Sequence, residues 1–384
     1  MTAWQTVELE QVARIDRSSI KPEAIEPGTA YLGLEHIEHG GEITDSQTVQ
    51  NGELKSSKFR FSPEHLLYGK LRPYLAKIAA PDFDGICSTD IIPLLPGADI
   101  DKRYLLHFLR QKRMVDYATS RASGANLPRL SPKELAKFKI PLPPLAEQKR
   151  IATILDAADA LRAKRRETLA QLDTLLQSTF LEMFGDPVTN PKGWKKTPMG
   201  QLMRIRRGGS PRPIKRYLGG TINWVKIGDA TRSDDDLYIR SCAEKISEDG
   251  LSKTTLLQPG SLIFANSGVS LGFARILSVQ GAIHDGWLAF EGFDEDLLDR
   301  IFFLKALNGI TEHFRKTAPS GTQPNLNTSI MKAFQIILPP IGDQRHFAAI
   351  VQSVEQQKSR LRAHLDELDA LFGSLQTRAF AGEL

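Results

Sequence analysis

The sequence predicts an α+β protein in which two related, mixed α/β domains are separated by two long helices that form an antiparallel coiled coil. The first observation is a repeat: residues 140–155 (IPLPPLAEQKRIATIL) and 336–351 (IILPPIGDQRHFAAIV) align without a gap, 196 positions apart. The second is that each copy combines short β-rich runs with one long helical pattern. The chain is therefore one unit of about 190 residues written twice.

The first mixed domain is predicted over residues 1–140. Its β-rich runs include LLYGKLRPYLAKIAA (66–80), and a helical pattern follows at 101–118. The motif W-x7-V-x-R-I at 4–15 returns as W-x7-L-x-R-I at 194–205, near the start of the second copy. Strands and helices mixed in this way favour the α+β class.

The central helix is predicted over residues 141–185. It follows a Pro-Pro step, which ends the preceding element, and Glu147 lies in its first turn, where the helix dipole favours an acid. Its seam, the stripe of positions spaced alternately by three and four residues, is interrupted by two arginines whose aliphatic stems are expected to pack. The predicted seam residues are Leu155, Ala158, Arg162, Arg165, Leu169, Leu172, Leu176 and Thr179.

The second mixed domain is predicted over residues 186–341 and the C-terminal helix over 342–384. The β-rich run SLIFANSGVSLGFARILSV (261–279) and a helical pattern at 296–314 repeat the organisation of the first copy. The C-terminal seam is the more regular of the two. Its residues are Val351, Val354, Lys358, Leu361, Leu365, Leu368, Phe372 and Leu375.

Two arrangements of the long helices are open: each packs on its own domain, or the two pack on each other. A length of about 37 residues exceeds that of most globular helices, and the two helices share a sequence with each other. We therefore expect them to pair, in antiparallel orientation, because a duplicated chain that returns to its start gives a two-fold-like arrangement.

The composition is that of a folded soluble protein, with 41% hydrophobic and 25% charged residues. A polar N-terminus and the lack of any long apolar run lead us to expect a cytoplasmic location. Cys87 and Cys242 have no partner at metal-ligand spacing, so the sequence indicates neither a disulfide framework nor a zinc site. Each cysteine is expected to act as a small buried hydrophobe.

Excess positive charge is concentrated in residues 186–341, where Lys and Arg outnumber Asp and Glu by 20 to 15. The segment RIRRGGSPRPIKRY (204–217) is predicted to be a loop whose glycine amides and arginines bind phosphate or guanine edges. The alternative is a solvated basic loop. In the first domain, Lys70 and Arg72 form a weaker counterpart of this basic segment. For each of them, pairing with a carboxylate is an equally good interpretation.

Sequence motifs for catalysis are missing. No glycine-rich dinucleotide or phosphate loop occurs, and neither does the N-P-P-Y or D-P-P-Y tetrapeptide expected of an enzyme that methylates DNA bases. A nuclease centre built from Asp82 and Glu147 is disfavoured, because Glu147 lies about 65 positions away at the start of a long helix. His36 and His39 give only a weak metal pattern. The sequence predicts no catalytic and no metal-binding residue.

At this point the repeats resemble a known family, the specificity subunits of Type I restriction-modification systems. The resemblance rests on the two long helices, IPLPPLAEQKRIATILDAADALRAKRRETL and ILPPIGDQRHFAAIVQSVEQQKSRLRAHLDEL, and more weakly on the W-x7-V and SG-x4 motifs in each half. It covers essentially the whole chain. Gly342 and Asp343 depart from the more usual Ala-Glu or Glu-Glu before the repeated glutamine.

The resemblance implies a non-catalytic subunit. Residues 1–140 and 186–341 would be target-recognition domains, each binding one half of a bipartite site in double-stranded DNA, and the helices would set the spacing. Its implied partners are two modification (methyltransferase) subunits and restriction (translocase and nuclease) subunits, without a membrane. S-adenosylmethionine, ATP and magnesium would be used by those partners, and this chain would hold no cofactor.

Two other classes stay open, namely an autonomous DNA-cleaving enzyme and a coiled-coil adaptor that binds no DNA. For the recognition function, the basic and amide side chains near the two SG motifs and in the 204–217 segment are the candidate contacts. The predicted DNA-binding residues are Lys70, Arg72, Arg121, Asn126, Arg129, Arg206, Arg207, Arg212, Lys215, Arg216, Gln323 and Asn325.

Overall fold

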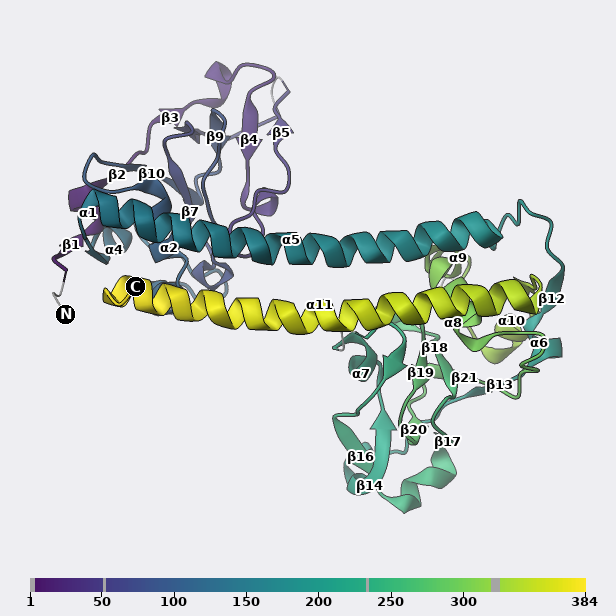
Figure 1. Ribbon diagram of the computed structural model, residues 1–384. Helices are drawn as coiled ribbons and strands as arrows, with labels where there is room; N and C mark the ends of the chain where they lie inside the picture. Colours follow the sequence, from purple (N-terminus) through teal and green to yellow (C-terminus); the bar gives the residue numbers. More distant parts are fainter. Residues whose placement is uncertain (1–3, 51–52, 233–234, 319–324) are drawn as a thin grey trace. The chain divides into compact units, whose positions relative to one another are not determined.

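The computed structural model describes residues 4–50, 53–232, 235–318 and 325–384 (Figure 1). The chain forms two compact units, one of Met1–Glu167 with Ala363–Leu384 and the other of Thr168–Arg362. Each unit holds one mixed domain together with a part of each long helix. The α+β class and the two long helices that the sequence predicts are confirmed.

The first domain is built on two small sheets. One has four strands in the order β2 (Ala13–Ile15), β10 (Ile91–Pro96), β7 (Leu66–Gly69), β8 (Ile78–Ala79). The other has five, in the order β3 (Ser19–Ile20), β6 (Lys58–Phe61), β9 (Gly85–Cys87), β4 (Ala30–Leu32), β5 (Gln47–Thr48). The helices are α1 (Leu9–Val12), α2 (Lys102–Leu109), α3 (Lys112–Arg121) and α4 (Pro132–Ala136), with short 3-10 turns η1 (Pro22–Ala24), η2 (Leu34–His36) and η3 (Pro73–Leu75).

The second domain repeats this plan. Its five-stranded sheet has the order β13 (Arg204–Arg207), β21 (Trp287–Glu291), β18 (Leu262–Ala265), β19 (Ala274–Leu277), β15 (Tyr238–Ile239). Its four-stranded sheet has the order β16 (Glu244–Ile246), β14 (Leu218–Val225), β20 (Gly281–Ile283), β17 (Thr255–Leu257). The helices are α6 (Met199–Leu202), α7 (Ile227–Thr231), α8 (Arg300–Gly309), α9 (Thr311–Thr317) and α10 (Thr328–Ala333), with η4 (Ile214–Arg216), η5 (Glu248–Lys253) and η6 (Gly268–Ser270).

The ends of each domain are joined by one short antiparallel pair of strands. In the first domain β1 (Thr6–Glu8) pairs with β11 (Lys139–Pro141), which places Val7 opposite Ile140. In the second, β12 (Lys196–Pro198) pairs with β22 (Gln335–Ile337), which places Thr197 opposite Ile336. Each domain therefore begins and ends at the same place, beside the start of a long helix.

The long helices are α5 (Leu145–Phe184) and α11 (Ile341–Ala381), drawn in teal and yellow in Figure 1. They have 40 and 41 residues, slightly more than the predicted length. All sixteen predicted seam positions are buried or half-buried. Within each unit the helices run antiparallel: Arg162 of α5 pairs with Asp369 of α11, and Asp173 of α5 pairs with Lys358 of α11.

The helix ends also pack on the domains, so both of the arrangements considered from the sequence occur together. Phe380, near the end of α11, lies 5.1 Å from the ring of Tyr104 and 5.4 Å from that of Phe108, both on α2. Phe184, the last residue of α5, lies 4.8 Å from the ring of Phe302 on α8. Phe184 and Phe380 occupy the same position of the repeat.

The repeated glutamine ties the start of each long helix to its own domain. The Gln148 side chain is fully buried, accepts a hydrogen bond from the Asp101 amide at 2.8 Å, and donates to the carbonyls of Asp99 and Pro143 at 3.0 and 2.8 Å. Asp101 is the N-cap of α2, so one buried amide group joins the starts of two helices.

Gln344 repeats this arrangement in the second unit. It accepts a hydrogen bond from the Asp299 amide at 2.9 Å and donates to the carbonyls of Leu297 and Pro339 at 3.0 and 2.8 Å. Asp299 is in turn the N-cap of α8. The recurring Pro-Pro-x-x-x-Gln pattern is thus explained by hydrogen bonds inside the fold: the glutamine side chain bonds the carbonyl of the first proline and the amide of the aspartate that caps a helix of the domain.

We expect Gln148→Leu to lower the free energy of unfolding by about 2–4 kcal/mol, because the Asp101 amide and the carbonyls of Asp99 and Pro143 lose the buried side chain to which they are hydrogen-bonded. Chemical denaturation of the full chain measures this change. The exposed Gln177→Leu, on the same helix, is the matched control and should change stability by less than about 0.5 kcal/mol. Equal effects of the two substitutions would show that the buried amide does not anchor the helix.

Both cysteines are free thiols, and burial raises the pKa of each to about 12. Cys87 is buried as expected, whereas Cys242 is only half-buried. In the described ranges no group of three or more His, Cys, Asp or Glu side chains is arranged to hold a metal ion. A search of the same residues found no helix with the length and apolar character needed to cross a membrane.

Candidate nucleic-acid interface

In the first domain, the predicted contact residues gather where the loop after α3 folds back on the β7–β8 hairpin. The Arg72 amide donates to the Pro128 carbonyl at 2.7 Å, and the Leu130 amide donates to the Lys70 carbonyl at 2.9 Å. An isolated bridge pairs Leu71 with Arg129. The fold therefore brings together residues that lie about 60 positions apart in the sequence.

Asp90 neutralises two of the cations in this group. Arg129 forms hydrogen bonds to its carboxylate at 3.0 and 3.3 Å, and this pairing raises the pKa of Arg129. Lys70 approaches the same carboxylate at 3.8 Å. Carboxylate pairing, the alternative considered for Lys70 from the sequence, is therefore what the structure shows for Lys70 and also for Arg129.

Arg72 and Arg121 differ from this pair. Within the described ranges neither has an ion pair to a carboxylate, and both side chains are exposed. The Arg121 guanidinium lies 5.2 Å from the centre of the Tyr117 ring. Asn126 is exposed in the loop after α3 and has no side-chain hydrogen bond among the described residues. These three polar groups are available to a ligand.

The tip of the β7–β8 hairpin holds an unusual backbone. Arg72 and Ala76, on either side of η3, have φ angles of 52° and 49°, in the left-handed region that non-glycine residues seldom adopt. Between them the Tyr74 side chain is 48% exposed. Such strain is often retained at functional positions. Tyr74 was not among the contacts predicted from the sequence, although an aromatic residue among cations is a recognisable nucleic-acid pattern.

In the second domain the predicted basic loop is partly a strand, which corrects the sequence interpretation. Arg206 and Arg207 belong to β13 and are paired with β21. Both nitrogens of the Arg206 guanidinium fork bind Glu291, at 2.6 and 3.1 Å. The Nε of Arg207 donates to the Asp285 carbonyl at 3.0 Å. Both side chains thus have partners inside the domain.

The glycines of this segment do not form the predicted phosphate cradle. The Gly208 amide donates to the Trp287 carbonyl at 2.9 Å and the Gly209 amide to the Ile283 carbonyl at 3.1 Å. A Cβ on Gly208 would lie 2.2 Å from the His284 carbonyl oxygen. These glycines are therefore needed for close backbone packing, and their amides are already used.

Three of the predicted cations remain available in this segment. Arg212, Lys215 and Arg216 are exposed, and the last two lie on η4. None of the three has an ion pair or side-chain hydrogen bond within the part of the chain that the structure describes. This basic segment, Arg212–Arg216, is the cationic surface of the second domain that fits the sequence prediction best.

The β18–β19 hairpin is the second domain's equivalent of β7–β8. An isolated bridge pairs Ser267 with Asn325, at the positions of the repeat that match Leu71 and Arg129. The Asn325 side-chain oxygen accepts a hydrogen bond from the buried Asn266 at 3.2 Å, so part of its polar capacity is used internally. Val269, at the hairpin tip on η6, is 96% exposed. Gln323 lies outside the described residues.

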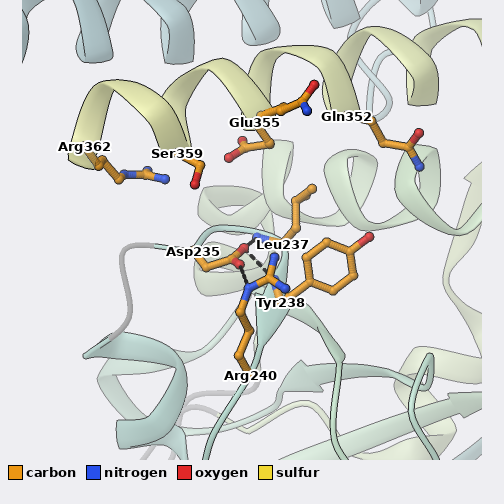
Figure 2. A pocket seen from close by; sticks show the side chains of 9 residues that line it. Asp235, Leu237, Tyr238, Arg240, Gln352, Glu355, Ser359 and Arg362 are labelled. Carbon is orange, nitrogen blue, oxygen red and sulfur yellow. Dashed lines mark hydrogen bonds and ion pairs between the residues drawn. The ribbon is translucent and has the colours of Figure 1, made fainter. Parts of the chain in front are cut away.

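Hollows lie beside the long helices in both units. One in the second unit, of about 550 Å³, lies between α11 and the start of β15, and Figure 2 shows Arg240 bound to Asp235 within it, at 2.7 Å. The first unit has a cleft of about 970 Å³ between α3, α5 and α11. Neither hollow includes any of the predicted DNA contacts.

Comparison with known proteins gives one consistent result. The family model described as Type I restriction modification DNA specificity domain matches residues 1–172 and again residues 191–368. The specificity subunit of the Type I restriction enzyme EcoDI, from Escherichia coli, is 31% identical to this chain over 191 residues. These residues are 48% of this chain and 42% of that protein. The MjaIX specificity subunit of Methanocaldococcus jannaschii is 24% identical over 76% of this chain and 71% of its own.

A solved structure shows the same fold. A chain from a study of complex assembly and conformational transition in the type I R-M system covers 100% of this chain and 99% of its own length, with a TM-score of 0.62 and 22% identity. The curated match to the EcoDI subunit, by contrast, spans less than half the length of that relative. The two ranges matched by the family model correspond to the two copies of the repeat.

Proposed function

This chain belongs to the Type I restriction modification DNA specificity family, and we propose that it is the DNA-recognition subunit of a Type I restriction-modification complex. In this function each domain recognises one half of a bipartite target in double-stranded DNA. The observation that carries the proposal is the double match of the family model, one match for each domain. As a specificity subunit, the chain is not itself an enzyme.

The recognition surface of the first domain is proposed at the β7–β8 tip and the loop after α3. Arg72, Arg121 and Asn126 are exposed there beside Tyr74, so positive charge for phosphates and amide groups for base edges lie together. Lys70 and Arg129 contribute less, because Asp90 already pairs with both. Their role is to hold the hairpin and the loop in one arrangement.

In the second domain the proposed surface combines the Arg212–Arg216 segment with the β18–β19 tip. Arg206 and Arg207 were predicted to contact DNA, and we retain them as contacts that would first have to leave Glu291 and the Asp285 carbonyl. Gln323 and Asn325 complete the set by position in the repeat. The second domain thereby recognises a different half-site, since its exposed residues differ from those of the first.

The helices are proposed to set the spacing and to bind two modification subunits, with restriction subunits joining the complex. Exposed leucines at matching positions of the repeat support two similar docking surfaces: Leu175 on α5 and Leu371 on α11 are each 51% exposed. Methylation and cleavage would be performed by these partners with S-adenosylmethionine, ATP and magnesium. The chain itself would hold no cofactor, and the complex would act in the cytoplasm without a membrane.

The contacts are tested by titrating DNA with the chain assembled with its modification partner. If Arg72 and Arg212 bind phosphate, Arg72→Ala and Arg212→Ala each lower affinity for every sequence and reduce the salt slope by about one. If they bind base edges, about 1–3 kcal/mol is lost at one base position.

The exposed Lys195→Ala, in the second domain, is the control for loss of a surface charge. It should leave affinity and salt slope unchanged, since Lys195 lies next to β12 and not in the proposed surface. If the two arginine variants bind DNA as the control does at every salt concentration, both arginines belong to solvated loops and the proposed surface is wrong.

A further inference from the structure

The seam of each long helix is interrupted by a cation at the same position of the repeat, Arg162 in α5 and Lys358 in α11, and α5 also carries Arg165 in its seam. Arg162 of α5 has 18% of its side chain exposed and Lys358 of α11 has none. Burial by itself lowers the pKa of Lys358, but its hydrogen bond with Asp173 and the charge of Glu355 outweigh burial and raise it. The buried side chain is therefore charged.

The acids around these cations are also related by the repeat. Arg162 binds Asp369 of the opposite helix and Asp159 of its own helix, both at 2.5 Å. Lys358 binds Asp173 of the opposite helix at 2.5 Å and Glu355 of its own at 3.1 Å. We call the first set (Arg162, Asp159, Asp369) the first ion cluster and the second set (Lys358, Glu355, Asp173) the second ion cluster.

The second cluster also contacts the domain that packs on it. Asp236, next to β15, lies 3.4 Å from Lys358 and equally far from Arg275 of β19. Lys305 of α8 lies 3.6 Å from Glu355. One buried cation therefore links both helices to the second domain.

The first cluster makes an equivalent link in the first unit. The Arg162 guanidinium lies 4.3 Å from the centre of the Phe372 ring, and this ring lies 6.2 Å from that of His107. His107, buried on α2, bonds Asp156 of α5 at 2.7 Å. His107 and Lys305 lie at matching places on α2 and α8, each six residues after the aspartate that caps its helix.

The cations distinguish the observed register of the helices from its nearest alternatives. An apolar seam repeats every seven residues, so sliding one helix by seven keeps apolar side chains facing each other. Counting along the helices, such a slide places Lys358 opposite Arg166 or Phe180, and Arg162 opposite Arg362 or Gln376. Every alternative therefore places a seam cation opposite a like charge or opposite a residue without a carboxylate, and leaves it only the acid of its own helix.

The phenylalanines at the helix ends favour the same register, but they act differently. Phe184 and Phe380 make apolar contacts, and apolar contacts tolerate repacking with other side chains of similar volume. A buried charge has no such substitute. A single polar group in a coiled-coil seam is known to select one register at some cost in stability.

We propose that the two ion clusters lock the register of α5 against α11, with Arg162 and Lys358 as positioning residues for the spacing between the two half-sites. This inference rests on the proposed function for its consequence in DNA recognition, but the register itself is a property of the isolated chain. Each domain is fixed to the start of its own helix by Gln148, which bonds Asp101, or by Gln344, which bonds Asp299. The offset of the two helices then sets the spacing.

The test measures the distance between spin labels at Glu182→Cys on α5 and Arg360→Cys on α11, in the full chain with Cys87→Ala and Cys242→Ser. Both label sites are exposed and belong to the second unit. A slide of seven residues changes their separation along the helix axis by about 10 Å. The Arg162→Met, Lys358→Met variant should stay folded, because methionine fills the seam, but should show a second distance shifted by about this amount.

A conservative variant supplies the control. Lys358→Met alone should shift or broaden the distance distribution, and Lys358→Arg, which keeps a positive charge beside Asp173, Glu355 and Asp236, should retain the single parent distance. A single parent distance in the double methionine variant would overturn the lock. The same would follow if Lys358→Arg and Lys358→Met gave the same distance distribution while both remained folded by circular dichroism.

The measurement also separates this inference from the proposed function, since it requires neither DNA nor partner subunits. If the labels show the lock but no target sequence is methylated in the host, the register lock stands and the proposed function fails. If methylation is sequence-specific but the distance never changes in the variants, the function stands and the lock fails.

Discussion

Exchanging residues 186–335 for the equivalent segment of a relative changes one half of the methylated target and leaves the other half and the spacing intact. The physical reason lies in how the second domain is inserted. β12 and β22 pair side by side, so the segment leaves and re-enters the structure at one place. The contact of Gln344 with Pro339 and the pairing of α5 with α11 through Arg162 and Asp369 involve only residues outside the exchanged segment, so the exchange leaves them in place. Sequencing of methylated bases in the host measures the outcome.

Two controls sharpen this result. Exchange of residues 1–140 should alter the opposite half of the target, since β1 and β11 close the first domain in the same way. Exchange of a domain for that of a relative with the same half-site should change nothing. If one exchange altered both half-sites, the two domains would not recognise DNA independently, and the proposed division of labour would be wrong.

A paired insertion of seven residues, one between the ion clusters in α5 and one at the matching place in α11, should lengthen the spacing between half-sites. Seven residues keep the seam on one face and add about 10.5 Å of helix, which corresponds to about three base pairs at 3.4 Å each. Positions 166–169 in α5 and 362–365 in α11 are suitable, because both clusters then stay intact. The affinity for DNA should fall. The added base pairs rotate one half-site around the DNA axis by a larger angle than the added residues rotate the helices around the coiled-coil axis.

The matched controls insert the seven residues in one helix only. The helices then have unequal lengths between the clusters, so one cluster must break and the protein should lose stability, by about 3–5 kcal/mol for a buried pair separated from its partner. A replacement of seven residues without change in length controls for sequence. If the paired insertion left the methylated spacing as in the parent, helix length would not determine the spacing.

The helices were the part of this fold that the sequence predicted best. Spacing by three and four residues indicates directly which side chains are buried. The eight seam positions predicted between Leu155 and Thr179, and the eight between Val351 and Leu375, are buried or half-buried as predicted. Duplication strengthened the prediction, because two copies of one pattern are harder to produce by chance. Arg162 looked like an interruption of the seam and Lys358 was not distinguished from its apolar neighbours, and the acids that pair with them on the opposite helix were not recognised.

The candidate contacts were less accessible to sequence reasoning. Whether an arginine is available depends on distant partners: Arg206 binds Glu291, which lies 85 residues further along the chain. Gly208 resembled part of a phosphate loop, but its role is set by the His284 carbonyl that packs against it. Such pairings follow from the sheet order, which local patterns do not contain. Gln148 was visible in the repeat, and its recurrence at Gln344 was the available signal.

The central claim is that this chain selects a bipartite DNA target through two independent domains, and sequencing of methylated bases in the host, with and without the gene, tests it most directly. The account predicts one methylated motif of two short sequences separated by a fixed gap, which disappears when the gene is deleted and returns when the full-length chain is restored. An unchanged pattern of methylation after deletion would contradict it.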